Sequence, residues 1–298
     1  YHPADDNDAL EYIELYNQMA VNVDLSNWRI GGVDFDFPEG TVIDARSYLT
    51  IAKVPANYAG ALGPYNGTLS NSGETLRLIN NNRAFRTTAG AGPTGAISDS
   101  LESRRIMDEI TYGDTYPWPF SPDGSGSTLA KIDPATGSAH PQNWTHSTAI
   151  NGTPGAANVQ AIVPTISLNE LDASTSPAFQ LEIHNPGALP TALGGMVISS
   201  SNALHNDYTL PASSLASGTF TTINATALGF TPDDNDRLFL FTAGKTALID
   251  AGRVDDRLKG RSPDGIGRWF NPDTATFGSA NSFTFEDAIV INEGFYHA

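Results

Sequence analysis

The chain contains no cysteine, and this absence removes several classes of site at once. A disulfide framework, a zinc–thiolate site and a cysteine nucleophile are all excluded. We therefore expect packed β-sheets, rather than covalent cross-links, to hold the fold together.

Charged residues and long apolar runs are also scarce. Only 16% of the residues are charged, and 33 acidic against 16 basic side chains give a formal net charge of −17. Such a surface repels nucleic acid and anionic membranes, so neither is an expected partner. No stretch approaches the roughly 18 apolar residues that a membrane-spanning helix needs, so no membrane insertion is expected. An acidic surface favours solubility and is compatible with cation binding.

Motifs of enzyme active sites are missing as well. The six histidines do not occur in HxxxH, HxH or HExxH patterns, which disfavours a metalloenzyme. There is no GxSxG motif, and the glycine loop that holds Ser125 and Ser127 has no base nearby in the sequence. We therefore predict a protein that is not an enzyme and that needs no cofactor.

What the chain does contain is many turn residues between short alternating segments. It has 28 glycines and 19 prolines. In residues 11–17, Tyr12 and Tyr16 point to one face and Ile13 and Leu15 to the other, which is typical of a half-buried strand. Turn signals recur every 8–12 residues or so, and no convincing helix is present. This pattern predicts antiparallel β-sandwiches.

The two halves of the chain repeat the same order of segments. Four of seven recurring blocks are residues 11–17 and 179–185, 106–112 and 248–254, 120–134 and 261–273, and 154–158 and 277–281. An ordered repeat of this kind predicts two copies of one fold. We expect a first domain at 1–160 with an insertion at about 81–101, a second domain at 161–283, and an extension at 284–298. Long insertions are usually functional or mobile.

The C-terminal extension contains a predicted strand. Its residues are Ile289, Val290, Ile291, Asn292, Glu293 and Phe295. The same pattern at residues 166–173 opens the second copy, whereas the first copy shows no such strand. The terminal strand is therefore predicted to complete the first domain, in the same chain or in a neighbouring one. Since the chain starts at Tyr1 rather than at Met, we interpret it as a mature or excised piece.

The ordered blocks of the first copy resemble the lamin-tail domain, an immunoglobulin-like sandwich. The resemblance covers nearly all of residues 1–158 and rests on the motifs EYIELYN, VDLSNWRI, FPEGTVIDARSYLTIAK, NSGETLRLIN, DEITYGD and PWPFSPDGSGSTLAKIDP. The second copy diverges, with Met196 in the place of Trp28 and no counterpart of Trp144. The resemblance implies an all-β fold of two tandem immunoglobulin-like antiparallel sandwiches, a binding or structural module without catalytic residues, and an extracellular or cell-surface location in a bacterium.

Two functions remain open at this level. In the first, the protein is a structural subunit of an extracellular fibre or surface assembly. Copies then join head to tail, because the terminal strand enters a groove beside Tyr12, Ile13, Leu15 and Tyr16 of the next subunit. In the second, it is a binding or adhesion module excised from a larger exported protein. That module is monomeric or folds the strand back on itself, and the sequence does not identify its surface or glycan ligand.

Two acidic loops could bind a hard cation. Their acids are Asp5, Asp6 and Asp8, and Asp233, Asp234 and Asp236. Oxygen ligands at this spacing suit calcium, but neither loop has the full EF-hand pattern. Asx-rich turns explain both loops without a metal, so calcium is the alternative interpretation.

An aromatic strip is the last candidate binding feature. Tyr116, Trp118 and Phe120 alternate with prolines, and such a strip could stack on sugars or fill a groove of a partner. Packing against the edge of the sandwich is the favoured interpretation.

Overall fold

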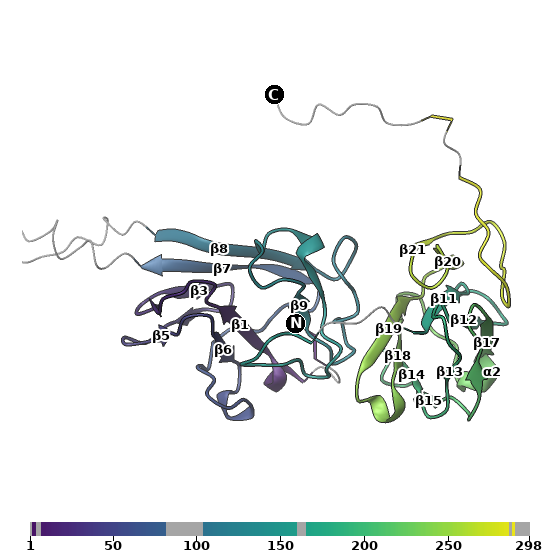
Figure 1. Ribbon diagram of the computed structural model, residues 1–298, viewed down its shortest axis with the longest axis horizontal. Helices are drawn as coiled ribbons and strands as arrows, with labels where there is room; N and C mark the ends of the chain where they lie inside the picture. The colour runs from purple at the N-terminus through teal and green to yellow at the C-terminus, as the bar shows by residue number, and fades with distance from the viewer. Residues whose placement is uncertain (1, 4–6, 82–103, 160–164, 286–287, 290–298) are drawn as a thin grey trace, which may run out of the picture. The chain divides into compact units, whose positions relative to one another are not determined.

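The computed structural model describes residues 2–3, 7–81, 104–159, 165–285 and 288–289 of the 298-residue chain. The chain divides into two compact units (Figure 1). Unit 1 comprises Tyr1–Ile162 and Lys245–Ile249, and unit 2 comprises Val163–Gly244 and Asp250–Ala298. The division after residue 162 lies close to the domain boundary that we expected after residue 160.

Unit 1 is built almost entirely from short strands, as its alternating segments predict. The strands are β1 (Tyr12–Tyr16), β2 (Val23–Asp24), β3 (Arg29–Gly31), β4 (Phe35–Asp36), β5 (Val42–Ile43), β6 (Tyr48–Ala52), β7 (Gly73–Asn81), β8 (Arg104–Gly113), β9 (Leu129–Lys131) and β10 (Trp144–His146). Among the described residues, the 3₁₀ turn η2 (Asp8–Leu10) precedes β1, and η3 (Pro55–Asn57) and η6 (Pro141–Asn143) connect later strands. The predicted all-β fold is therefore confirmed for this unit.

Antiparallel pairing organises unit 1 into one larger sheet and three smaller ones. The larger sheet has the order β4-β3-β7-β8, and the two-stranded sheets are β1-β6, β2-β5 and β9-β10. Strands β7 and β8 form the long hairpin of Figure 1, paired from Gly73 and Gly113 to Asn81 and Arg104. The predicted insertion falls between them, and residues 82–101 of it lie outside the described part of the chain.

The core of unit 1 lies between these sheets. Its buried side chains are Leu25, Ile30, Val33, Phe35, Phe37, Ile43, Ile51, Tyr65 and Leu69. Ile13 and Leu15 of β1 pack against this cluster but are only partly buried. Burying each such side chain fully stabilises a fold by roughly 1.5–3 kcal/mol, so unit 1 forgoes part of this contribution at β1.

Unit 2 has eight strands in the same order as the first eight strands of unit 1, preceded by one further strand and followed by two. They are β11 (Ser167–Leu171), β12 (Gln180–His184), β13 (Thr191–Ala192), β14 (Val197–Ser200), β15 (Tyr208–Thr209), β16 (Ser214–Leu215), β17 (Phe220–Asn224), β18 (Arg237–Phe241), β19 (Leu248–Arg253), β20 (Lys259–Ser262) and β21 (Arg268–Phe270). A 3₁₀ turn, η7 (Ala243–Lys245), joins β18 to β19.

One short helix in unit 2 departs from the expectation of a chain without helices. Helix α2 (Ala225–Leu228) begins where the Asn224 side chain accepts a hydrogen bond from the Ala227 N–H. It ends at Gly229, whose φ of 82° is the left-handed conformation that glycine adopts readily. A single capped turn is too short to produce a helical periodicity in the sequence.

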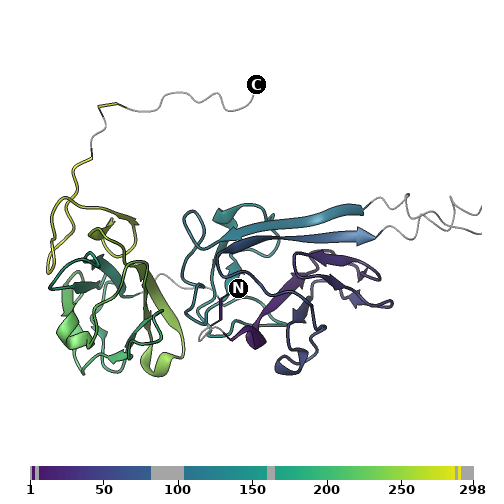
Figure 2. The ribbon, with the colours of Figure 1, turned by 180° about the vertical axis from the view of Figure 1, so that it is seen from behind.

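Unit 2 forms two main sheets, which Figure 2 shows from behind. One has the order β17-β12-β11-β20-β21, the other β15-β14-β18-β19, and β13 pairs with β16 separately. The pairings β4-β3-β7-β8, β6-β1 and β2-β5 of unit 1 therefore recur as β15-β14-β18-β19, β17-β12 and β13-β16. The described part of unit 1 contains no pairing that corresponds to β12-β11-β20.

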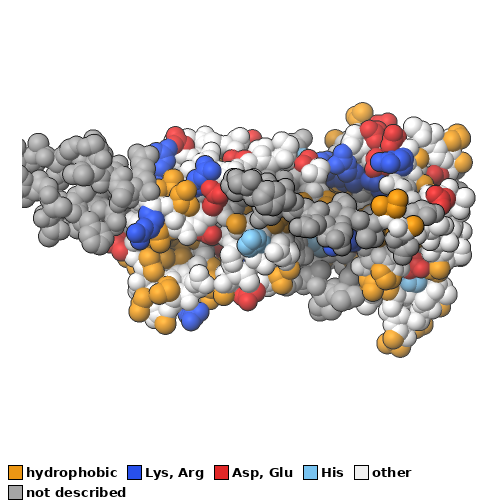
Figure 3. Space-filling model, turned by 90° about the horizontal axis from the view of Figure 1, so that it is seen from above, with side chains coloured by type: hydrophobic (Ala, Val, Ile, Leu, Met, Phe, Trp, Pro, Cys, Tyr) orange, Lys and Arg blue, Asp and Glu red, His pale blue; other side chains and the backbone are white. Residues whose placement is uncertain are grey.

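The surface agrees with the low content of charged residues. The face drawn in Figure 3 carries red and blue side chains in small groups among orange and white ones. No helix among the described residues is long and apolar enough to cross a membrane.

Candidate strand-acceptor site

Strand β11 is the central strand of the five-stranded sheet in unit 2. It pairs with β12 from Ser167 and His184 to Leu171 and Leu181, and with β20 through Glu170 and Gly260. All five residues of β11 are buried. Leu168 and Leu171 are 0% exposed, as is Ile166 just before the strand. Strand β11 thus fills a slot that is apolar on its inner face.

The polar side chains of β11 also form hydrogen bonds with neighbouring segments. The Asn169 amide donates to Glu182 Oε1 at 2.8 Å and to Asp264 Oδ1 at 3.1 Å. Its Oδ1 accepts from the Gly265 N–H at 2.7 Å. Asn169 therefore joins β12 to the turn at residues 262–265, and we call this arrangement the Asn socket, made of Glu182, Asp264 and Gly265.

The neighbouring Glu170 is bonded in the same manner. Its carboxylate accepts from the Thr276 N–H at 2.8 Å and from the Thr276 hydroxyl at 3.2 Å. Desolvation by burial raises the pKa of Glu170, and it raises the pKa of Glu182 to about 7. The strand is thus recognised through an Asn-Glu pair as well as through apolar side chains.

Unit 1 shares two side-chain hydrogen bonds with the region around β12 in unit 2. Asn17 and Asn185, at matching places in the two copies, each donate to the carbonyl oxygen of the residue four positions later, Val21 and Leu189. Glu14 accepts from the Gly155 N–H at 2.5 Å, as Glu182 accepts from the Gly278 N–H at 2.5 Å. These shared bonds establish that β1 corresponds to β12 residue by residue.

The two copies differ in what lies beside this strand. Strand β12 pairs with β17 on one side and β11 on the other. Within the described residues, β1 pairs with β6 alone. All five residues of β1 are only partly buried, whereas four of the five residues of β12 are fully buried. The predicted acceptor residues Tyr12, Ile13, Leu15 and Tyr16 all lie on this strand.

The turn that forms the Asn socket recurs in unit 1 with a different occupant. Asp123 and Gly124 correspond to Asp264 and Gly265, and Asp123 is 0% exposed. The ring Nδ1 of His2 contacts Asp123 Oδ1, and the Gly124 N–H donates to the His2 carbonyl oxygen at 3.1 Å. His2 therefore meets the counterparts of two of the three groups that Asn169 meets in unit 2, a contact that no pattern in the sequence predicts.

The predicted donor strand lies almost wholly outside the described residues. Of its members only Ile289 is described, in a bend and 92% exposed. Val290, Ile291, Asn292, Glu293 and Phe295 lie beyond the described part of the chain.

A buried carboxylate in unit 1 was not expected from the sequence. Glu11 is 2% exposed and accepts hydrogen bonds from the Leu69 N–H and from the Tyr65 hydroxyl. Burial raises the pKa of Glu11. The sequence signal for this burial is that Glu11 aligns with the apolar residue Phe179 of the second copy. Phe179 is 0% exposed in unit 2.

The acidic loops are only partly described. Asp5 and Asp6 lie outside the described residues, and the exposed Asp8 begins η2. Asp233 and Asp236 do approach one another, together with His205, and the possible ligand atoms lie within 4.8 Å of one another. Asp234 is not part of this group.

The chemistry of this group differs from the predicted calcium loop. His205 Nδ1 lies 3.6 Å from Asp236 Oδ2, and the same oxygen accepts from the Asp233 N–H. His205 also stacks on Phe230. One nitrogen and two oxygen ligands suit a first-row transition metal better than calcium, which prefers oxygen ligands throughout.

The aromatic strip is divided between the surface and the interior. Trp118 is buried and lies 6.2 Å from Trp144, measured between ring centroids, whereas Tyr116 is 73% exposed. The position of Trp118 agrees with the favoured interpretation that the strip packs against the sandwich.

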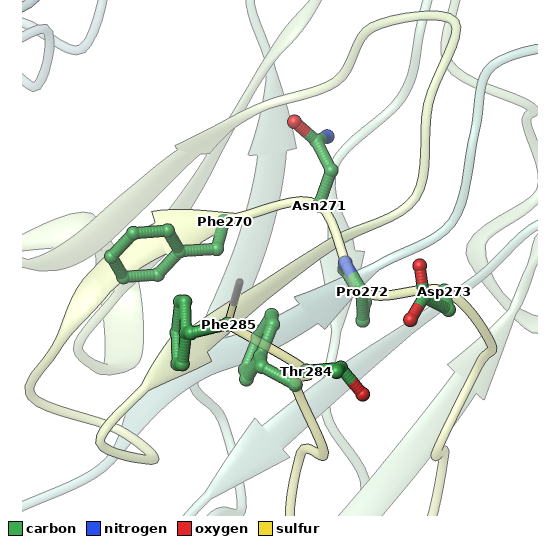
Figure 4. A pocket seen from close by; sticks show the side chains of 7 residues that line it. Phe270, Asn271, Pro272, Asp273, Thr284 and Phe285 are labelled. Atoms are coloured by element: carbon green, nitrogen blue, oxygen red, sulfur yellow. The ribbon is translucent and has the colours of Figure 1, made fainter. Parts of the chain in front are cut away.

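A second aromatic group was not foreseen. Phe270, Phe283 and Phe285 have ring centroids 5.4–5.8 Å apart. Figure 4 shows Phe270 and Phe285 beside the shallow pocket to which Pro272 also contributes. This group anchors the described end of unit 2, just before the residues that lead to the predicted donor strand.

Comparison with known proteins finds a family match within the first unit. Residues 1–113 match the model of the family described as Lamin Tail Domain. No curated protein and no solved structure matches the chain. The resemblance deduced from the motifs of the first copy is therefore confirmed over these residues, and it indicates a β-sandwich that serves as a binding or structural module.

Proposed function

We propose that this protein, whose first unit matches the lamin tail domain, is a non-enzymatic structural subunit of an extracellular assembly. Copies join head to tail when the C-terminal strand of one subunit, residues 289–295, pairs with the open edge of β1 in the next. The supporting observation is that β12 has strands on both sides, whereas β1 pairs with β6 alone among the described residues.

An open strand edge is the physical basis of this contact. A strand edge without a partner leaves backbone N–H and C=O groups to water and attracts another strand. In unit 2 the slot holds Ile166 and Leu168, both 0% exposed. Ile289 and Ile291 occupy the matching positions of the terminal segment and are of similar volume. The segment thus supplies ladder hydrogen bonds and buried apolar side chains together.

The geometry of such a contact favours a polymer. The donor segment and the acceptor strand lie near opposite ends of one sequence, so the interface uses two different surfaces of each copy. A contact between two different surfaces repeats without limit unless rotation closes it into a ring.

The assembly is tested by single substitutions in the whole chain. Full-length protein is expected to form polymers in sedimentation and electron microscopy. Ile291→Asp places a charge in the apolar slot and is expected to leave monomers. Ile266→Asp is the matched control, because Ile266 is 61% exposed in unit 2, and it should polymerise as the unaltered chain does.

A truncation separates the strand from the rest of unit 2. Removal of residues 288–298 keeps Phe283 and Phe285 on Phe270, so unit 2 retains its aromatic group. This truncated chain is expected to be monomeric. If it forms the same polymer, the proposal is wrong. If the full-length chain is itself monomeric, the alternative of a monomeric binding or adhesion module replaces the proposal.

A further inference from the structure

This inference rests on the proposed function and concerns the residues of the donor strand that unit 1 recognises. We propose that unit 1 selects its incoming strand through an Asn-Glu pair, Asn292 and Glu293 of another copy, which Glu14, Asp123 and Gly124 bind after His2 has left them.

The sequences of strand β11 and of the predicted donor strand align without a gap. The motif Ile-x-Leu-Asn-Glu at residues 166–170 corresponds to Ile-Val-Ile-Asn-Glu at residues 289–293. In unit 2 the pairing of Leu168 with Ile183 is followed by a shift of register and then by the pairing of Glu170 with Glu182. Asn169 lies at this shift and turns its side chain into the Asn socket.

Unit 1 already contains the groups of the socket. Glu14 is bonded to Gly155 as Glu182 is to Gly278, and Asp123 and Gly124 belong to the same Ser-Pro-Asp-Gly turn as Asp264 and Gly265. An incoming Asn292 can therefore donate to Glu14 and to Asp123 and accept from the Gly124 N–H. A side chain with both a donor and an acceptor is required for these three bonds, and asparagine has both.

The glutamate of the pair also has a partner in unit 1. Glu170 is held by the N–H and the hydroxyl of Thr276, and Thr153 occupies the matching position in unit 1. The Thr153 hydroxyl donates to the Ala157 carbonyl oxygen at 3.1 Å. In the proposed complex Glu293 takes this donor, because a charged acceptor makes the stronger hydrogen bond.

His2 competes with the incoming strand. It contacts Asp123 through its ring and Gly124 through its carbonyl oxygen. Both contacts use groups that Asn292 needs, so His2 and the donor strand exclude one another. The contact of His2 with the turn therefore opposes binding of the incoming strand.

Peptide binding tests the selection. The receptor is the full-length Ile291→Asp chain, whose own strand is disabled, and the probe is a synthetic peptide of residues 286–298. Asn292→Ala in the peptide is expected to weaken binding roughly 10- to 100-fold, because up to three hydrogen bonds to buried or charged groups are lost. Glu293→Ala is expected to weaken it roughly 10-fold. His297→Ala, which lies beyond the paired segment, is the control and should bind as the unaltered peptide does.

The receptor side is tested in the same assay. His2→Ala in the receptor is expected to tighten binding by about 3- to 10-fold, since one competing hydrogen bond is removed. Glu14→Gln combined with Asn292→Ala should show a non-additive effect, as residues in direct contact do.

The possible results separate this inference from the proposed function. If no peptide binds, the proposed function fails and the inference fails with it. If the Asn292→Ala and Glu293→Ala peptides bind as tightly as the unaltered one, the strand is accepted but not through this pair, and the inference alone is overturned. Unchanged or weaker binding by the His2→Ala receptor overturns the competition with His2.

Discussion

Replacement of Asn169 by alanine tests the Asn socket where the structure defines it completely, in unit 2. Asn169 is 0% exposed, and its side chain joins Glu182, Asp264 and Gly265. We expect the substitution to lower the free energy of unfolding of unit 2 by roughly 2–4 kcal/mol, without changing that of unit 1.

The magnitude follows from what each partner loses. The Gly265 N–H is buried and would be left without its acceptor, which costs about 1–3 kcal/mol. Glu182 would keep only its bond from Gly278, which adds roughly 1 kcal/mol. Asp264 would still accept from the Asn281 N–H at 3.0 Å, so its share is small.

Urea unfolding followed by hydrogen-exchange mass spectrometry measures this effect, because peptides of the two units are read separately. Asn271→Ala serves as the control. Asn271 is a surface residue whose side chain donates to the Leu258 carbonyl oxygen in an exposed hydrogen bond, so its loss should cost less than about 1 kcal/mol. If Asn169→Ala destabilises unit 2 no more than Asn271→Ala does, the socket contributes nothing to strand recognition and the inference for unit 1 loses its basis.

Two further predictions concern titration and metal binding. Because burial raises the pKa of Glu182 to about 7 from 4.5, folded unit 2 holds a proton that the unfolded chain releases, and its stability should rise as the pH falls from about 7.5 to 5, by up to about 3 kcal/mol. Urea unfolding across this pH range should show this slope in unit 2 and a smaller slope in Glu182→Gln, because Glu170, whose pKa burial also raises, still titrates. A slope of opposite sign, or a slope unchanged in that variant, contradicts the assignment. At His205, Asp233 and Asp236, we expect zinc to raise the melting temperature more than calcium at equal concentration, because one ligand is a nitrogen. Equal shifts, or a zinc shift that survives Asp236→Asn, would speak against a site there.

Much of the fold could be predicted because the strands carry their own pattern. Alternation in residues 11–17 predicted a strand that the structure places at Tyr12–Tyr16, and the match of residues 166–173 to the terminal segment predicted one that it places at Ser167–Leu171. Side chains alternate along a strand, so a half-buried segment records its two faces in the sequence. The helix Ala225–Leu228 could not be predicted in this way, because its four residues make only one turn and show no helical periodicity.

The candidate sites could be predicted less completely. The acceptor strand was predicted because a repeat with a missing member is visible in the sequence, and its role stays a prediction. The Asn socket was not, because Asn169 and Gly265 are 96 positions apart and meet only when β11 and the turn after β20 are packed together. His205 likewise joins Asp236 across a distance in sequence that no local spacing rule covers.

The buried and partly buried carboxylates show the same limit. Glu11, Glu14 and Glu182 each lie in an alternating segment, where a glutamate is ordinarily assigned to the solvent face. Only packing reveals that burial raises their pKa and that loop N–H groups hold them.

The amino-acid sequence by itself determined the all-β class, the order of the strands, the internal repeat and the matching of residues 289–293 to 166–170. These properties depend on side-chain alternation and turn chemistry, which are local. The tertiary structure alone decided that β12 has neighbouring strands on both sides, whereas β1 pairs with β6 alone among the described residues. It also decided which polar groups Asn169 and His2 meet. Those facts depend on the packing of residues far apart in the chain, and hydrogen bonds and burial between such residues arise only once the sheets have come together.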